Sequence, residues 1–362
     1  MGIRGSLVSE SGSLYSSLKP EKPGASQYLM GLGVLLAALA AGLLIGPADI
    51  DRSSILLELL DRLPVVSVDS GLPPIQKNII WEVRLPRVLL GALVGMTLAV
   101  SGASYQAVFR NPLADPYLLG VAAGAGLGAT VAIVTGSGDG VGTFDFVPIS
   151  AFLGALSAVA LTYLLGFSSG TRRSPATLLL AGVAVASFLT AAQTFIQQQN
   201  VETIRQVYTW ILGRLNTASW DEVSLLAPYA FIAGFVILMY RRTLDVMRLG
   251  DVEASSLGVR PQVVRLVVIC SASLGTAAAV AVSGLIAFVG IIVPHTVRLI
   301  ASASNRIVLP LSLIYGAAFL VAVDLLSRTL TSPAEIPIGV ITAFCGAPFF
   351  LVVLRRSKRS LI

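Results

Sequence analysis

The chain has 362 residues, of which 55% are hydrophobic and only 12% are charged. Soluble proteins carry charge on about a quarter of their residues, so this balance excludes an ordinary soluble domain and indicates a polytopic membrane protein. The net charge of +6 agrees with Lys and Arg in cytoplasmic loops and does not call for a nucleic-acid partner.

Residues 1–26 are polar and rich in serine, which predicts a disordered cytoplasmic tail. The apolar run from Gln27 to Ile45 is too long for the core of a signal peptide and suits a retained span. Nine similar runs follow, so the sequence predicts about ten transmembrane helices of roughly 20 residues each. The predicted spans are 27–45, 84–107, 117–135, 147–167, 176–199, 223–240, 262–282, 284–301, 307–327 and 336–354.

These spans form one all-α transmembrane domain, 27–354, and leave no room for a sizeable soluble domain. Its longest cytoplasmic connection is 241–261, and a basic cytoplasmic tail follows at 355–362. With both termini in the cytoplasm, most Lys and Arg residues fall on the cytoplasmic side, as the positive-inside rule requires.

A polar segment with two prolines separates the second and third spans, from Gln106 to Gly120. Each proline removes a backbone donor and disfavours the helical region for the residue before it, so one helix ends near Phe109 or Arg110. Asp115 followed by Pro116 has the chemistry of an N-cap and a first helical position. We therefore predict a stiff corner, formed by Arg110, Asn111, Pro112, Asp115 and Pro116.

Small residues recur every four positions in the two spans that flank this corner. Such stripes let helix backbones approach closely in lipid, so they predict packing and not chemistry. The residues are Gly91, Gly95, Ala99 and Ala103 in one span and Gly120, Gly124 and Gly128 in the other.

Three arginines, Arg84, Arg87 and Arg328, lie at the outer ends of their spans in this topology. Long side chains that reach the headgroups would explain each one singly. A docking surface for an acidic partner would explain all three together.

The fifth predicted span carries Ser187, Thr190, Thr194 and Gln197 on one helical face, because their spacings are three and four. This face could line a passage for a large, partly polar solute. Hydrogen bonding between helices is an equally good reading of the same pattern.

The cytoplasmic connection predicts a short helix between Gly250 and Gly258, with Asp251 as N-cap and Gly258 as C-terminal stop. It could simply join two spans. Alternatively it is a lever contacted by a soluble subunit, with apolar contacts from Val252, Ala254 and Leu257.

Few residues suit catalysis or metal binding. The single histidine, His295, stands beside Pro294, and with Asp324 it makes a poor proton relay, so we expect it to satisfy backbone groups freed by the proline. Cys270 and Cys345 sit in apolar runs and form no cysteine–histidine cluster, so we predict no metal site. The chain lacks the phosphate loop G-x-x-x-x-G-K-[ST], so ATP-driven work would need another chain, and no enzyme active site is predicted.

Several motifs together resemble the permease subunits of the vitamin B12 and iron-chelate family of ABC importers, from about Tyr28 to Leu354. They are Arg84-Leu-Pro-Arg87, the R-N-P-L-A-D-P core of the corner, Leu178 to Gly182, Trp210 to Gly213, Leu249 to Val259, Gly284 to Gly290 with Val293-Pro-His295, Asp324 to Arg328, and Glu335 to Gly339. The resemblance implies a vitamin B12 permease-like bundle in a bacterial cell membrane.

The resemblance also implies partners: a second permease subunit, identical or a paralogue, two cytoplasmic ATPase subunits that use ATP and Mg, and an extracytoplasmic binding protein. This chain would bind no cofactor itself. Its cargo would be a metal chelate moved by alternating access, with iron–siderophore ahead of haem and cobalamin. Nothing in it predicts a nucleic-acid partner.

Roles for individual residues follow from the same resemblance. Arg84, Arg87 and Arg328 would meet carboxylates of the binding protein. The coupling helix in the ATPase groove would comprise Leu249, Gly250, Asp251, Val252, Ala254, Leu257 and Gly258. The pathway and its cytoplasmic gate would use Ser187, Thr190, Thr194 and Gln197 with Arg172, Arg173, Ser174 and Pro175. His295 would have no catalytic role.

Two other functions are compatible with the residues alone. One is a proton-coupled secondary transporter that acts without an ATPase and uses His295 and Asp324. The other is a membrane scaffold or receptor that only binds the extracytoplasmic protein.

Overall fold

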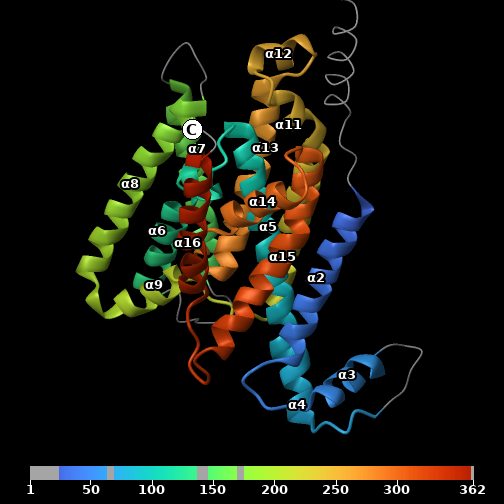
Figure 1. The fold of residues 1–362 in the computed structure, drawn as a ribbon. Coiled ribbons are helices and arrows are strands. Elements are labelled where there is room, and N and C mark those ends of the chain that lie inside the picture. Colours follow the sequence, from blue (N-terminus) through green and yellow to red (C-terminus); the bar gives the residue numbers. More distant parts are fainter. Residues whose placement is uncertain (1–23, 63–68, 137–145, 169–174, 360–362) are drawn as a thin grey trace, which may run out of the picture.

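The computed structural model describes residues 24–62, 69–136, 146–168 and 175–359, and all regular elements in these ranges are helical (Figure 1). Seven helices in the described ranges are long and apolar enough to cross a membrane, and three shorter apolar helices accompany them. The prediction of an all-α polytopic protein with about ten spans is confirmed.

The seven long apolar helices in the described ranges are α2 (Ala25–Leu44), α5 (Leu85–Phe109), α7 (Phe146–Ser168), α8 (Pro175–Gln199), α10 (Trp220–Met239), α13 (Pro261–Ser283) and α15 (Asn305–Thr329). Helix α16 (Ile338–Arg359) is long as well, but only its first part, Ile338–Leu351, is apolar, so it counts among the three shorter apolar helices. The shorter elements are α3 (Arg52–Asp61), α4 (Pro74–Asn78), the π-helix η1 (Ile79–Arg84), the 3-10 helix η2 (Pro116–Leu119), α6 (Val121–Val134), the 3-10 helix η3 (Val201–Thr203), α9 (Ile204–Ile211), α11 (Arg241–Met247), α12 (Asp251–Ser256) and α14 (Val289–Ile300). Because α16 continues to Arg359, the segment predicted as a basic tail begins as helix.

Helix α5 is the centre of the bundle and is buried along most of its length. It packs against α10, α13, α14 and α15, while α6, α7 and α8 pack on one another to one side. Helix α2 lies at the periphery against α15, and α12 stands at the opposite end of the bundle from α3 and α4 (Figure 1). These two ends are called the α12 end and the α3 end below.

The predicted small-residue stripes are sites of close backbone contact. A Cβ atom on Gly95 would lie 2.2 Å from the carbonyl oxygen of Gly316 in α15, and one on Gly124 would lie 2.2 Å from that of Gly154 in α7. No side chain fits in such a gap, so glycine is required where these helices cross. The packing prediction is confirmed at these positions.

Two predicted spans are shorter than expected. Helix α6 begins at Val121 and not near Tyr117, because Gly120 has a left-handed backbone (φ 82°) that separates it from η2. Helix α14 begins at Val289, five residues later than the predicted span, because Gly284 (φ 69°) ends α13 and Phe288 (φ 69°) is also left-handed. The bundle therefore contains a half-length helix whose start lies inside it.

The α3 end contains elements that the sequence analysis did not predict. Glu58 of α3 is buried and accepts hydrogen bonds from Ser70 (2.6 Å) and from the indole of Trp81 (3.0 Å). Lys77 of α4 forms an ion pair with the same carboxylate at 3.1 Å. Through Glu58, α3 therefore packs against α4 and η1 by hydrogen bonds and an ion pair.

Candidate functional site

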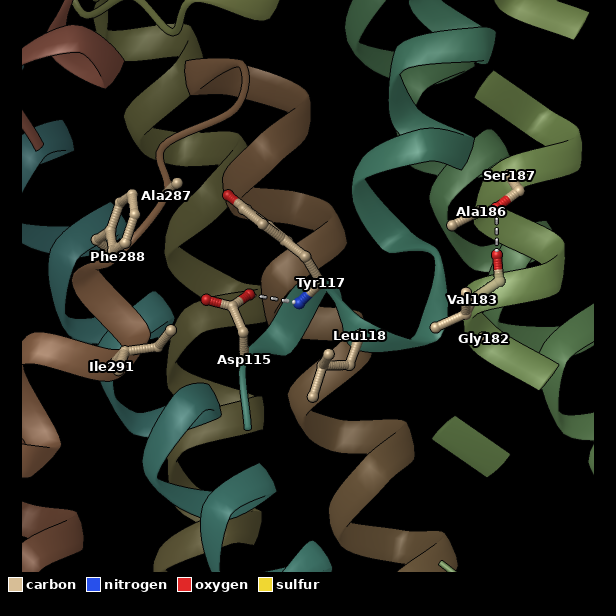
Figure 2. A pocket seen from close by; sticks show the side chains of 10 residues that line it. All are labelled: Asp115, Tyr117, Leu118, Gly182, Val183, Ala186, Ser187, Ala287, Phe288 and Ile291. Atoms are coloured by element: carbon tan, nitrogen blue, oxygen red, sulfur yellow. Dashed lines mark hydrogen bonds between the residues drawn. The ribbon is translucent and has the colours of Figure 1, made fainter. Parts of the chain in front are cut away.

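An open cavity of about 460 Å³ lies between η2, α8 and the start of α14 (Figure 2). Its wall is mostly apolar and includes Leu118, Val183 and Ile291. Three polar side chains also reach it, namely Asp115, Tyr117 and Ser187.

The two polar side chains from the corner are already engaged by the chain itself. Asp115 Oδ1 accepts a hydrogen bond from the backbone amide of Tyr117 at 2.8 Å, as Figure 2 shows. The hydroxyl of Tyr117 donates to the carbonyl of Ile286 at 3.0 Å, and the amide of Ile286 lies 3.2 Å from the same hydroxyl. The wall therefore offers few free polar groups to a solute, which favours weak binding.

A second cavity, of about 570 Å³, shares Ala287 with the first and is lined by Leu212, Leu285 and Phe344 among others. The irregular segment from Gly284 to Phe288 thus borders both cavities. A Cβ atom on Gly346 of α16 would lie 2.3 Å from the Phe288 ring, so this ring packs directly on α16. A left-handed non-glycine residue is costly and persists only where its surroundings fix it.

The sequence analysis assigned no site role to Tyr117, Ala287 or Phe288. The available signal was the pair of glycines at 284 and 290, which bracket an apolar run before Pro294. Broken helices line cavities in membrane proteins, and this pattern could have been read in that way.

The residues predicted for the pathway share one face of α8, and only Ser187 lines the first cavity. Thr190 and Thr194 are exposed on the same face, and Gln197 is partly exposed. Ser187 donates to the carbonyl of Val183, and Thr194 donates to that of Thr190, both at 2.9 Å. These two hydroxyls therefore bond within their own helix.

The predicted gate lies mostly beyond the described residues. Arg172, Arg173 and Ser174 are outside them, and Pro175 is the first residue of α8.

The corner is held by its own hydrogen bonds. Helix α5 ends at Phe109, as predicted, and Arg110 adopts a left-handed conformation (φ 51°). Asn111 accepts at its side chain from the Leu113 amide at 2.9 Å, and Asp115 caps η2, also as predicted. At the end of α5, Gln106 Nε2 donates to the carbonyl of Gly290 at 3.0 Å, which connects the corner to α14.

Helix α12 lies where a short cytoplasmic helix was predicted, and Gly258 (φ 82°) follows it as the expected stop. Two details of the prediction are wrong. Gly250 is the N-cap and Asp251 the first helical residue, with its carboxylate held by Arg110 of the corner and by Arg265 of α13 at 3.1 Å.

The second detail concerns the contact face of α12. Ala254 has no exposed surface, because it anchors the helix to the rest of the chain. The exposed apolar side chains are Leu249, Val252 and Leu257, at 64%, 75% and 64% exposure. A partner at this helix would therefore touch these three and not Ala254.

The three arginines expected on an outer docking surface are buried, with 3% exposure for Arg84, 8% for Arg87 and 2% for Arg328. Arg84 donates to the carbonyl of Leu43 in the last turn of α2 (3.0 Å) and to that of Ala48 just after it (2.6 Å). The expectation that these arginines are exposed is wrong, because backbone and carboxylate groups of the chain hold them.

Arg87 and Arg328 belong to one buried charge cluster. Arg87 forms ion pairs with Asp324 at 2.9 Å and with Glu335 at 2.8 Å. Arg328 lies 3.6 Å from Asp324 and donates to the carbonyl of Gly42 in α2. The cluster joins α2, α5 and α15 near the α3 end.

The two residues of the alternative proton relay belong to different clusters. The ring of His295 packs edge-on against Phe349 of α16, with centroids 5.6 Å apart. Asp324 is engaged by Arg87 and Arg328. No observation therefore favours a relay between them.

Comparison with known proteins accounts for this architecture. The model of the FecCD transport family matches residues 34–356. A metal-chelate type ABC transporter in an inward-facing conformation superimposes with a TM-score of 0.78 at 30% identity, covering 91% of this chain and 99% of that one.

Curated relatives extend over most of the chain. The cobalamin import permease BtuC of Halobacterium salinarum is 42% identical over 293 residues, which is 80% of this chain and 77% of the relative. The Fe(3+)-citrate import permease YfmD of Bacillus subtilis is 34% identical over 331 residues, covering 91% and 95%. The hemin permease HmuU of Yersinia pestis is 37% identical over 291 residues, covering 77% and 84%. This chain therefore belongs to the FecCD transport family.

Proposed function

We propose that this chain is the permease subunit of an ATP-driven importer that carries a metal chelate from an extracytoplasmic binding protein into the cytoplasm by alternating access. The observation that carries the proposal is the α12 segment. Val252 of the helix and the flanking Leu249 and Leu257 are exposed, while Ala254 and Asp251 fix the helix to the bundle. An exposed apolar patch on an anchored helix suits contact with a soluble subunit.

The contacts of α12 support its role as a lever. Asp251 binds Arg110 of the corner, and at the end of α5 Gln106 bonds to Gly290 and to Arg298 of α14. Helix α14 in turn borders the first cavity. A displacement of α12 can therefore be transmitted to the cavity wall through these ion-pair and hydrogen-bond contacts.

We propose the following assembly: a second permease subunit, identical or a paralogue, two ATPase subunits that supply ATP and Mg chemistry, and a binding protein outside. The described residues contain charged side chains at the α12 end, including Arg242, Arg248 and Arg260, that suit the cytoplasmic face. In this orientation both termini are cytoplasmic. This chain would act as a permease without a cofactor or an enzymatic activity of its own.

The proposed cargo class rests on the cavity and on the relatives. Their names specify cobalamin, hemin and ferric citrate, all of which contain chelated metal. A largely apolar wall with few free polar groups leaves selection to the binding protein, in agreement with cargoes this different. Within this class we predict that the cargo is an iron–siderophore, with haem and cobalamin as the next candidates. Binding of these ligands to the cognate binding protein would decide among them.

Val252→Asp is expected to lower ATP-dependent uptake about tenfold or more while the permease stays folded. The side chain is exposed, so the monomer tolerates the change. An unpaired neutral polar group in an apolar contact already costs about 1–3 kcal/mol and a carboxylate costs more, and each 1.4 kcal/mol is tenfold in affinity. Uptake and ATP hydrolysis by the reconstituted complex in liposomes, with co-purification of the ATPase, measure the effect.

The matched control is Val201→Asp in η3, which is 68% exposed and stands far along the chain from α12. It should leave ATPase co-purification unchanged. Coupled uptake at the normal rate by Val252→Asp would contradict the contact. Uptake driven by a pH gradient in liposomes without ATPase would contradict the ATP-driven function and favour the secondary transporter.

We also propose that the binding protein docks at the α3 end, where the buried arginines set the shape of the surface.

Arg84→Gln is expected to lower both the melting temperature and the docking affinity, because each hydrogen bond from a charged donor contributes about 1.5–3 kcal/mol. Thermal melts, together with binding assays at low and high salt, separate a role of Arg84 in supporting the surface from a direct contact with the binding protein. A loss of affinity with an unchanged melting temperature would show instead that Arg84 contacts the partner directly. The control is Arg205→Gln, an exposed arginine of α9.

A further inference from the structure

A small polar pocket of about 260 Å³ lies near the α12 end, apart from the two cavities described above. Three guanidinium groups line it: Arg110 of the corner, Arg248 after α11 and Arg298 in the last turn of α14. The side chains of Gln106 and Asn305 complete its polar wall. The pocket therefore stands where α5, α11, α14 and α15 meet.

The positive charge in this pocket is only partly compensated. Arg110 shares the carboxylate of Asp251 with Arg265, which lies outside the pocket. Arg248 reaches the carboxylate of Asp245 only at 4.0 Å, and its Nη1 donates to the carbonyl of Ala303. Among the described residues no carboxylate pairs with Arg298, which donates to the neutral Gln106 side chain.

Asp245, the other acid near the pocket, is committed elsewhere. It accepts from the hydroxyl of Ser304 and from the backbone amide of Asn305, both at 2.6 Å, and lies 3.7 Å from Arg306. These groups hold it at the start of α15, so it cannot also neutralise Arg298.

Asn305 provides an independent observation. Its residue surface is 2% exposed, and its Nδ2 is buried with no hydrogen-bond partner among the described residues. A buried amide donor without a partner costs about 1–3 kcal/mol, so its presence on the wall of a cationic pocket calls for an acceptor.

We infer that this pocket binds a phosphate group. A phosphate has more acceptor oxygens than a carboxylate, and donors converge here from Arg248, Arg298 and Asn305 on three separate elements. Guanidinium groups are well suited to phosphate oxygens, since they donate in a planar fork. A carboxylate, with two oxygens in one plane, would satisfy fewer of these donors.

The phosphate can come from two sources, free phosphate in the cytoplasm or the headgroup of an anionic phospholipid. Either would bridge α11, α14 and α15 beside the corner that contacts α12. The site does not depend on the transported cargo, and its binding can be measured without transport.

The test uses the full-length permease in detergent, with inorganic phosphate against chloride at equal ionic strength in calorimetry and thermal melts. Native mass spectrometry with phosphatidylglycerol or phosphatidylcholine forms the second arm. We expect specific binding of phosphate, retention of phosphatidylglycerol, or both, and a loss of about tenfold or more in Arg298→Gln and Arg248→Gln. Asn305→Leu should also weaken binding, because it removes the unpartnered donor.

Arg260→Gln is the matched control, because it removes the same charge from an exposed position that does not line the pocket. Arg248 is half-exposed, so its variant should remain folded even if the Arg298 variant does not. Binding of phosphate alone identifies a small-anion site, and retention of phosphatidylglycerol alone identifies a headgroup site. Absence of both, or equal weakening by Arg260→Gln, would overturn the inference.

Discussion

Asp324→Asn is expected to destabilise the protein by about 3–5 kcal/mol, because it leaves Arg328 and Arg87 with an uncompensated buried charge. Both guanidinium groups are almost fully buried, and Asp324 itself is 2% exposed. Since Glu335 is the second partner of Arg87, part of the charge remains balanced, and Arg328 bears most of the loss. Thermal and denaturant unfolding of the purified permease measure the change.

Arg306→Gln is the control for this prediction. Arg306 is exposed and lies 3.7 Å from Asp245, and surface ion pairs of this kind contribute about 0–1 kcal/mol. The double variant Arg87→Met with Asp324→Leu should be less destabilised than the sum of its single variants, since it removes both partners. Equal stability of Asp324→Asn and Arg306→Gln would show that the buried cluster contributes little.

The same arginines show where prediction from sequence stopped. The sequence shows that these arginines stand at the ends of spans, and it also shows the acidic residues Asp324 and Glu335. Nothing local indicated that Asp324 pairs with a side chain 237 residues earlier in the chain. Pairing of this kind is decided by how the helices pack. The sequence analysis therefore treated these arginines as exposed, although the folded bundle buries them.

Features set by local backbone chemistry were predicted well. Pro112 and Pro116 placed the end of α5 and the start of η2, and Gly250 and Gly258 bracketed α12. Periodicity identified the spans because the bilayer fixes their length.

Orientation around a short helix was not predictable in this way. The six residues of α12 contain Val252 and Ala254, both apolar, and only the tertiary contacts decide which of them faces inward. Likewise the start of α14 depends on the left-handed backbone of Phe288, a residue for which no local rule favours that conformation. The cavity-facing segment was therefore the part of the site that the sequence analysis missed.

Gly102→Ala is expected to abolish most uptake, because α5 and α14 meet there with no space for a side chain. A Cβ atom on Gly102 would lie 2.0 Å from the carbonyl oxygen of Gly290, the same oxygen that accepts from Gln106. Overpacking of this kind costs about 1–3 kcal/mol, and here relief requires a shift at the start of α14. That shift would move Phe288 and Ile291 in the cavity wall. Uptake per folded permease, together with the melting temperature, measures both consequences.

Two further glycine variants show whether Gly102→Ala lowers uptake by destabilising the fold or by changing the shape of the cavity wall. Gly95→Ala places a Cβ atom 2.2 Å from the carbonyl oxygen of Gly316, so it overpacks α5 against α15, away from the residues that line the first cavity. Gly33→Ala in α2 meets nothing within 4 Å and should be neutral or slightly stabilising, since alanine favours helix. We expect Gly102→Ala to lose more uptake than Gly95→Ala at a similar melting temperature, because only Gly102 supports the half-helix beside the cavity. If uptake followed the melting temperature alone across the three variants, the contact between Gly102 and Gly290 would stabilise the fold without shaping the pathway.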